Sequence, residues 1–280
     1  MRAGERASGI SLMVGSGLAN QTGASIGALA FPVLGPVGVV AIRQWVAAAV
    51  LLGVGRPRLR AFSAGQWRLV LALALVYGAM NLTLYAAIDR IGLGLAVTLE
   101  FLGPLAVALA TAGRRTGVLS ALAATAAVVV LVRPQPSTDY AGITLGLTAA
   151  ACWACYILLN RAIGRRLPGL EGSAAAAGLS GLLYLPVGAV VLWLCGPTPL
   201  ALLCALAAGV LSSVVPLLAD LLALRRVPAH FFSVFMSVNP VFAALIGLLV
   251  LGQHLDLWSW AAIAVIAAAN TVTAGGGEAR

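Results

Sequence analysis

Apolar segments, each long enough for several helical turns, follow one another along the whole chain and are separated by short breaks rich in arginine, proline or glycine. An apolar helix crosses the hydrocarbon core of a bilayer with about 20 residues. The spacing therefore predicts about ten membrane-spanning helices and leaves no room for a separate soluble domain. The expected helices cover residues 10–30, 37–54, 68–88, 92–110, 117–132, 141–160, 173–193, 200–222, a segment that begins near Pro228 and includes 237–240, and 256–274.

The composition agrees with an all-α integral membrane protein. Of the 280 residues, 61% are hydrophobic and only 9% are charged, and the mean hydropathy is +1.04. A soluble core of this length could not bury so much apolar surface, so a lipid bilayer is the expected solvent. The net charge of +9 is spread between apolar segments. No basic face is left for a nucleic-acid partner.

The arginines predict how the chain is oriented in the membrane. If the N-terminus is cytoplasmic, 14 arginines lie on the cytoplasmic side, Arg90 and Arg133 lie outside, and Arg43 falls within a span. Cytoplasmic loops of membrane proteins are enriched in arginine and lysine. We therefore expect a multi-pass protein with both termini in the cytoplasm.

A weak internal repeat divides the chain into two halves. A shift of 136 residues without a gap places Pro104 on Pro240. The first repeat is expected to cover residues 1–133 and the second 140–275, with five helices each. Because five is an odd number, the second half must enter the membrane upside down. Inverted repeats with interrupted helices near the midplane are characteristic of secondary transporters.

A carboxylate and a proline lie in the middle of the expected helix 92–110. Glu100 would cost roughly 2.5–3.5 kcal/mol at that depth, so it needs a partner or a function. Pro104 removes a helical hydrogen bond, which a membrane helix tolerates where protein or a water-filled cavity takes over. We therefore expect this helix to line a polar cavity.

Arg43 lies at a depth similar to that of Glu100, in the second expected helix. One interpretation is a structural ion pair that makes two buried charges tolerable. In the other, Glu100 binds a proton or the ammonium group of a substrate, while Arg43 holds a substrate carboxylate. Proton coupling is then assigned to Glu100. The sequence leaves both interpretations open.

Further polar and aromatic side chains recur within four of the expected helices. Each alone could serve as a hydrogen-bonding contact between helices, but their clustering favours a shared cavity. Together with Arg43 and Glu100 they form the expected substrate-binding set: Asn20, Gln21, Tyr77, Asn81, Tyr85, Trp153, Tyr156 and Asn239.

Enzymatic and metal chemistry have little support. Residues 178–181 spell GxSG, the nucleophile motif of rhomboid intramembrane proteases, but no histidine is expected at the depth of Ser180. The chain has no Walker A sequence, and Cys152 and Cys155 have CxxC spacing without a second pair or a nearby histidine. We expect buried thiols, no cofactor, no metal and no enzymatic activity.

Three stretches resemble a known family: QTGASIGALAFPVLGPVGVVAIRQ (21–44), YGAMNLTLYAAIDRIGLGLAVTLEFLGPLAVAL (77–109) and ACWACYILLNRA (151–162). They are similar to the EamA-type drug/metabolite transporters, particularly to the threonine/homoserine exporter branch. The resemblance implies a ten-helix carrier of the bacterial inner membrane, built from two EamA repeats, that exports amino acids or related metabolites in exchange for protons.

The second half departs from the exporter pattern. Asn239 precedes Pro240 where the exporter branch has a glutamate, and LGQHL at 251–255 replaces the usual LGE. Glu100 is then the main carboxylate at depth. The resulting hypothesis is proton-linked export of small zwitterionic amino acids such as threonine and homoserine. The alternatives are efflux of drugs, nucleosides or other metabolites, and a passive facilitator or channel.

Overall fold

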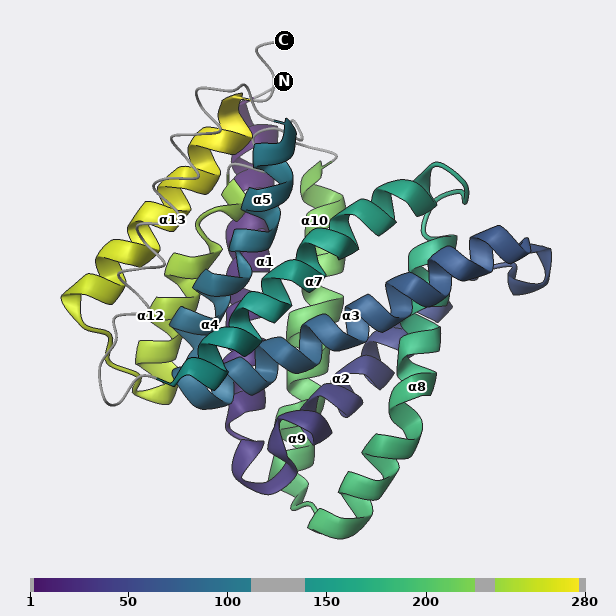
Figure 1. Ribbon diagram of the computed structural model, residues 1–280, viewed down its shortest axis with the longest axis horizontal. Helices are drawn as coiled ribbons and strands as arrows, with labels where there is room; N and C mark the ends of the chain where they lie inside the picture. Colours follow the sequence, from purple (N-terminus) through teal and green to yellow (C-terminus); the bar gives the residue numbers. More distant parts are fainter. Residues whose placement is uncertain (1–2, 112–138, 225–234, 277–280) are drawn as a thin grey trace.

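The computed structural model describes residues 3–111, 139–224 and 235–276, and within these ranges the chain is helical and contains no strand. The helices pack side by side (Figure 1). They are α1 (Ala3–Ala28), α2 (Phe31–Gly55), the short 3-10 helix η1 (Leu59–Ala61), α3 (Ala64–Ile91), α4 (Leu93–Glu100), α5 (Leu102–Thr111), α7 (Tyr140–Gly164), α8 (Glu171–Cys195), α9 (Pro199–Gly209), the π-helical turn η2 (Val210–Val214), α10 (Val215–Leu224), α12 (Asn239–Leu251) and α13 (Leu257–Gly276).

Four helices, α2, α3, α7 and α8, are long and apolar enough to cross a membrane. The predicted all-helical class is thus confirmed, whereas ten spans arranged as an inverted repeat stay a prediction. The span predicted at 117–132 lies outside the described residues. Shorter apolar helices cover Leu93–Val107, Pro199–Val214, Asn239–Leu251 and Leu257–Ala269.

Two helices that the sequence predicts as continuous are interrupted. The expected helix 92–110 is split at Phe101, directly after Glu100 and three residues before Pro104. The expected helix 200–222 contains the π-helical turn η2, two residues before Pro216. Proline has no N–H group and its ring crowds the preceding turn, so each interruption lies where a helical hydrogen bond is missing.

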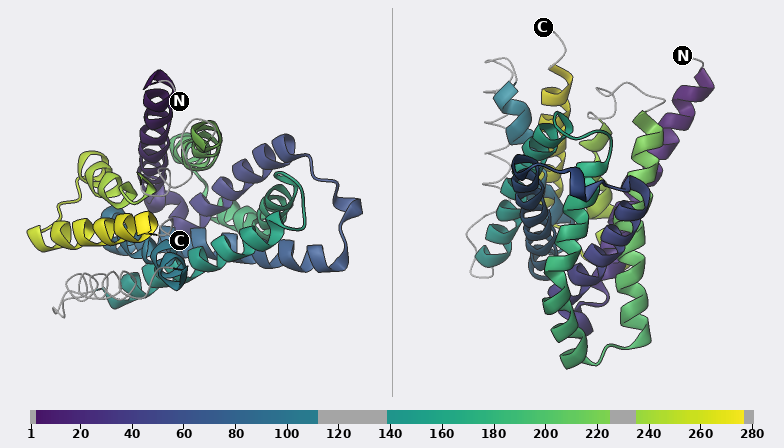
Figure 2. Two further views of the ribbon diagram at one scale, coloured as in Figure 1. Left: turned by 90° about the horizontal axis from the view of Figure 1, so that it is seen from above. Right: turned by 90° about the vertical axis from the view of Figure 1, so that its right-hand side faces the viewer.

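The bundle is built on close helix pairs from the two halves of the chain. Helix α2 packs along α8, α3 along α7, and α1 along α10, while α4 contacts α12. A Cβ atom at Gly181 of α8 would lie 2.7 Å from the Ala48 Cβ of α2, so this pair requires a small residue there. Figure 2 shows the same bundle from above and from its right-hand side.

The cysteines correct one expectation. All four thiols are free, and Cys155 and Cys195 are exposed rather than buried. These two cysteines lie on the apolar helices α7 and α8, on faces that other described helices do not cover. Many leucines on α8 and α9 are exposed in the same way. In a membrane such faces contact lipid.

Two connecting segments are joined at one end of the bundle. The guanidinium group of Arg58, before η1, forms an ion pair with Glu171 at the start of α8, with an N–O distance of 3.1 Å. Gln66 Nε2 donates a hydrogen bond of 2.9 Å to the Arg166 carbonyl. Ser63 and Gln66 form a capping box that starts α3. These contacts hold the α2–α3 and α7–α8 connections together.

At another point of the bundle, Asp139 caps α7 and binds α3. Its Oδ1 accepts a hydrogen bond of 2.8 Å from the Gly142 N–H, and its Oδ2 lies 3.0 Å from Arg90 Nε. The Gly142 N–H, with a smaller contribution from Arg90, holds the pKa of Asp139 below its usual value. This stabilisation is therefore present above the usual carboxyl pKa and is lost as the pH falls through the lowered pKa.

We expect Asp139→Ala to lower the melting temperature of the purified protein more than Asp139→Asn, because asparagine keeps a capping oxygen but loses the ion pair. Thermal unfolding between about pH 3 and 7 measures both effects. The difference between the wild type and the asparagine variant should shrink as the pH falls. A constant difference across this range would show that the charge of Asp139 does not contribute.

Candidate functional site

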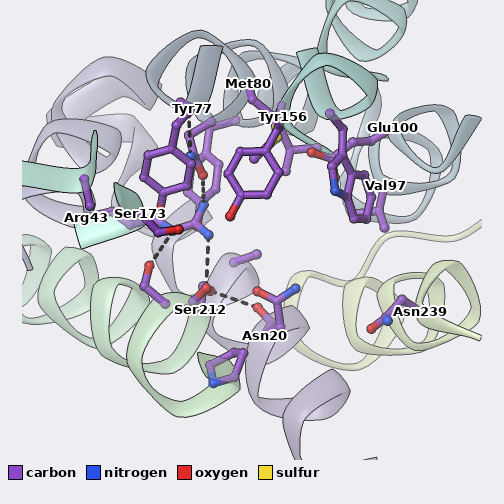
Figure 3. Close-up of a pocket in the computed structure, with 18 of the residues that line it drawn as sticks. Asn20, Arg43, Tyr77, Met80, Val97, Glu100, Tyr156, Ser173, Ser212 and Asn239 are labelled. Atoms are coloured by element: carbon purple, nitrogen blue, oxygen red, sulfur yellow. Dashed lines mark hydrogen bonds between the residues drawn. The ribbon is translucent and has the colours of Figure 1, made fainter. Parts of the chain in front are cut away.

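A cavity of about 400 Å³ lies among helices from both halves of the chain. Its volume falls in the range of about 300–1,000 Å³ typical of small-molecule sites. All of the predicted substrate-binding residues line it, although their role in binding stays a prediction (Figure 3). They are Asn20, Gln21, Arg43, Tyr77, Asn81, Tyr85, Glu100, Trp153, Tyr156 and Asn239.

Arg43 of α2 is held by acceptors from two other elements. Its Nη1 donates to Asn81 Oδ1 over 2.6 Å, its Nη2 to the Ser212 carbonyl over 3.1 Å, and its Nε to Ser213 Oγ over 3.4 Å. Asn81 is itself oriented, because its Nδ2 donates to the Tyr77 carbonyl over 2.8 Å. The guanidinium group thereby connects α2, α3 and η2, as the dashed lines in Figure 3 show.

The ring of Tyr85 lies beside this cluster. The Arg43 Cζ atom is 5.1 Å from the ring centre, a distance at which an aromatic face attracts a cation. Tyr85 is fully buried, and its hydroxyl group has no hydrogen-bond partner among the described residues. The ring therefore supports the guanidinium group by packing rather than through its hydroxyl group.

Glu100 is the last residue of α4 and lines the cavity. In Figure 3 it lies on the far side of Tyr156 from Arg43. Its side chain is only 6% exposed. Among the described residues its carboxylate has neither a hydrogen-bond partner nor an ion pair. A buried carboxylate without a partner is costly when ionised. A proton or the cationic group of a ligand can remove that cost.

A direct ion pair between Arg43 and Glu100, one of the two interpretations that the sequence left open, is not formed in this conformation. Within the described residues, ion pairs shorter than 4.0 Å join Arg58 to Glu171 and Arg90 to Asp139. Arg43 is bound instead by the uncharged oxygens of Asn81, Ser212 and Ser213. The two opposite charges thus belong to one cavity without neutralising each other by contact.

Aromatic side chains form much of the remaining wall. The ring centres of Tyr77 and Tyr156 lie 5.9 Å apart. The rings of Phe101 and Trp153 meet edge to face, with their centres 4.7 Å apart. These are favourable aromatic geometries that also expose π faces to a cation. The wall near Glu100 can therefore contact both an ammonium group and an apolar side chain.

Asn239 is the first residue of α12, and its side chain binds a backbone carbonyl. Its Nδ2 donates to the Met236 carbonyl over 3.0 Å, the carbonyl that lacks a helical donor because Pro240 follows four residues later. Its Oδ1 is buried and has no partner in the described part of the chain. In this conformation the Asn239 side chain binds the backbone of the turn before α12, and a ligand could reach its Oδ1 only after a movement.

Several lining residues were missed from the sequence. Ser212 and Ser213 are the clearest, since two adjacent serines interrupt the apolar segment 200–222 one helical turn before Pro216, which was the available signal. Ser173 lines the wall from the first turn of α8, and its hydroxyl group donates to Asn160 Oδ1 over 3.1 Å. Met80 and Met236 gave no signal, because methionines within apolar segments are ordinary core residues.

Comparisons with known proteins agree with these observations. The model of the EamA-like transporter family matches residues 140–274. A protein from Salmonella typhimurium, the threonine/homoserine exporter RhtA, is 34% identical over 257 residues, which cover 89% of this chain and 85% of the relative. The exporter of the same name from Escherichia coli is 33% identical over the same length and coverage.

A solved crystal structure is similar in fold. It aligns with 98% of this chain and 98% of its own, with a TM-score of 0.58 and 18% sequence identity. At that identity the likeness concerns the fold alone.

Proposed function

This chain belongs to the EamA-like transporter family, and we propose that it exports small zwitterionic amino acids, threonine and homoserine first among them, across the bacterial cytoplasmic membrane. Its relatives are transporters rather than enzymes. The substrate is inferred from the printed names of these relatives and from the chemistry of the cavity.

One observation carries the proposal: the cavity holds Arg43 and Glu100 without a direct ion pair between them. An amino acid brings a carboxylate and an ammonium group together. Its carboxylate can accept hydrogen bonds from the guanidinium group, and its ammonium group can neutralise Glu100. Binding then leaves neither buried charge unmatched, which is the condition for holding charges inside a membrane protein.

Transport requires that the cavity open alternately to the two sides, and an inverted repeat provides for this. The shift of 136 residues pairs α1 with α7, α2 with α8, α3 with α9 and α10, and α5 with α12. The packing follows the same exchange: α3 packs on α7 as α10 does on α1, and α5 packs on α7 as α12 does on α1. This symmetry of contacts supports a rocking movement of the two halves about the cavity.

The proposed orientation places both termini in the cytoplasm. Helix α1 begins and α13 ends at the same end of the bundle (Figure 1). Seven exposed arginines lie in the two connections that the Arg58–Glu171 ion pair joins, or in the adjoining ends of α3 and α7. Their concentration fits the cytoplasmic side. They are Arg56, Arg58, Arg60, Arg68, Arg161, Arg165 and Arg166.

The proposal is tested by efflux of a radiolabelled amino-acid panel from cells that express the protein. We expect threonine and homoserine to leave the cells faster than in the empty-vector control, against their gradient, and an uncoupler to stop this movement. Efflux that continues only down the gradient and ignores the uncoupler would instead identify a facilitator.

The aromatic wall makes one alternative specific. Tyr77, Tyr156, Phe101 and Trp153 could also contact a planar drug or nucleoside. Adding such compounds to the efflux panel separates the two substrate classes. If they leave the cells and amino acids do not, the fold assignment is unaffected and the proposed substrate is wrong.

A further inference from the structure

The position of Arg43 depends on a backbone carbonyl that Pro216 leaves free. The α-helical donor for the Ser212 carbonyl would be the N–H of residue 216, which proline lacks. The π-helical turn Val210–Val214 ends two residues before this proline, and such turns are frequent at functional sites. Arg43 Nη2 donates to the free carbonyl over 3.1 Å. A backbone acceptor in the second half of the chain thus holds a cation from the first half.

The anchored guanidinium group keeps donors for a ligand. Arginine has five N–H donors, and Arg43 uses three of them on Asn81, Ser212 and Ser213. Two donors therefore remain without an acceptor among the described residues. Because the fixed acceptors and the Tyr85 ring hold the guanidinium plane, a ligand that binds the remaining donors does not have to order this side chain.

Two other prolines in the described helices do not have this arrangement. The Met236 carbonyl that Pro240 frees is bound by Asn239 Nδ2, which belongs to the same helix. Pro186 lies inside α8 with an exposed side chain, away from the cavity. Pro216 differs from both because the carbonyl four residues before it, that of Ser212, accepts its hydrogen bond from Arg43, the cationic side chain of the cavity.

We infer that Pro216 is a positioning residue, which orients the Arg43 guanidinium group to bind the carboxylate of the substrate. The inference rests on the proposed function, because it requires a substrate with a carboxylate. Pro216 itself lines the cavity, but the inferred effect on the substrate passes through Arg43. It withholds an N–H group, so that the Ser212 carbonyl binds Arg43 instead of closing a helical turn.

Pro216→Ala tests this inference, because alanine restores an N–H group that competes with Arg43 for the Ser212 carbonyl. Displacement of bound radiolabelled threonine is measured on the purified protein in nanodiscs. The competitors are threonine and threoninol, in which a hydroxymethyl group replaces the carboxylate. We expect the Kd of threonine to rise about fivefold to tenfold, the effect of weakening one charge-assisted hydrogen bond, and the Kd of threoninol to stay unchanged.

Pro186→Ala is the matched control, since it makes the same change inside a helix away from the cavity, and it should keep the wild-type ratio of the two Kd values. Pro216→Gly also restores the N–H group and serves if the alanine variant does not fold. If both variants at position 216 keep the wild-type ratio, the inference is wrong and the proposed function is unaffected. If the wild type binds no threonine, the proposed function fails and the inference fails with it.

Discussion

Replacing Glu100 with glutamine is expected to remove the pH dependence of threonine efflux and to reduce net efflux by at least about tenfold. Glutamine has nearly the same shape but can neither release a proton nor neutralise an ammonium group. The carboxylate of Glu100 is buried in the cavity and has no partner among the described residues. A proton and a substrate cation can therefore replace each other at this one group, which is what exchange transport requires.

The measurement compares the initial rate of efflux from proteoliposomes at two external pH values, with and without an uncoupler. Glu171→Gln provides the control, because it removes a carboxylate that is paired with Arg58 and does not line the cavity. That control should keep the pH dependence of the wild type. If Glu100→Gln retains both its pH dependence and its sensitivity to the uncoupler, another group carries the proton.

The composition of the cavity could be predicted from the sequence to a large extent. Polar residues such as Gln21 and Asn81 are costly within apolar helices unless they meet one another or a cavity, so their clustering in four of the expected helices was informative. The described structure brings Gln21, Asn81, Glu100 and Asn239 to one cavity. What each of them does there was not predictable, because helix rotation and rotamers decide the contacts.

The Arg43–Glu100 pair shows this limit. Equal depth along two helices made an ion pair reasonable, but depth does not determine which acceptors lie nearer. Asn81 Oδ1 lies 2.6 Å from Arg43 Nη1, and the Ser212 carbonyl became available through a proline in a distant part of the sequence. A backbone acceptor has no signature in the sequence other than the proline that frees it.

The sequence indicated one of the two helix interruptions. Pro104 predicted a missing hydrogen bond within the helix 92–110, whereas the helix 200–222 was expected to continue past Pro216. At Pro104 the helix splits into α4 and α5 after Glu100, whereas before Pro216 it widens into a π-helical turn. A proline is present in both cases, but α4 and α5 pack against α7 and η2 packs against α1, so the proline alone does not specify the form of the interruption.

Gly103→Ala is expected to destabilise the protein by about 1–3 kcal/mol, the usual cost of overpacking. A Cβ atom at Gly103 would overlap the carbonyl oxygen of Ala150 on α7 and lie 3.0 Å from its carbonyl carbon. Backbone atoms cannot rotate away as a side chain can, so α5 and α7 must separate. The Phe101–Trp153 contact of 4.7 Å crosses between the same segments, so the cavity wall beside Glu100 should loosen as well.

The melting temperature in detergent, followed with a threonine-binding measurement, tests this expectation for Gly103→Ala. Gly53→Ala is the control, because Gly53 also lies in a helix and nothing stands within 4 Å of its added Cβ atom. There alanine should stabilise the helix by about 0.5–1 kcal/mol. The two substitutions add the same methyl group, so opposite shifts in melting temperature would arise from the close contact of α5 with α7. Equal shifts would mean that these helices can separate without cost, and that the interruption after Glu100 is not held by this contact.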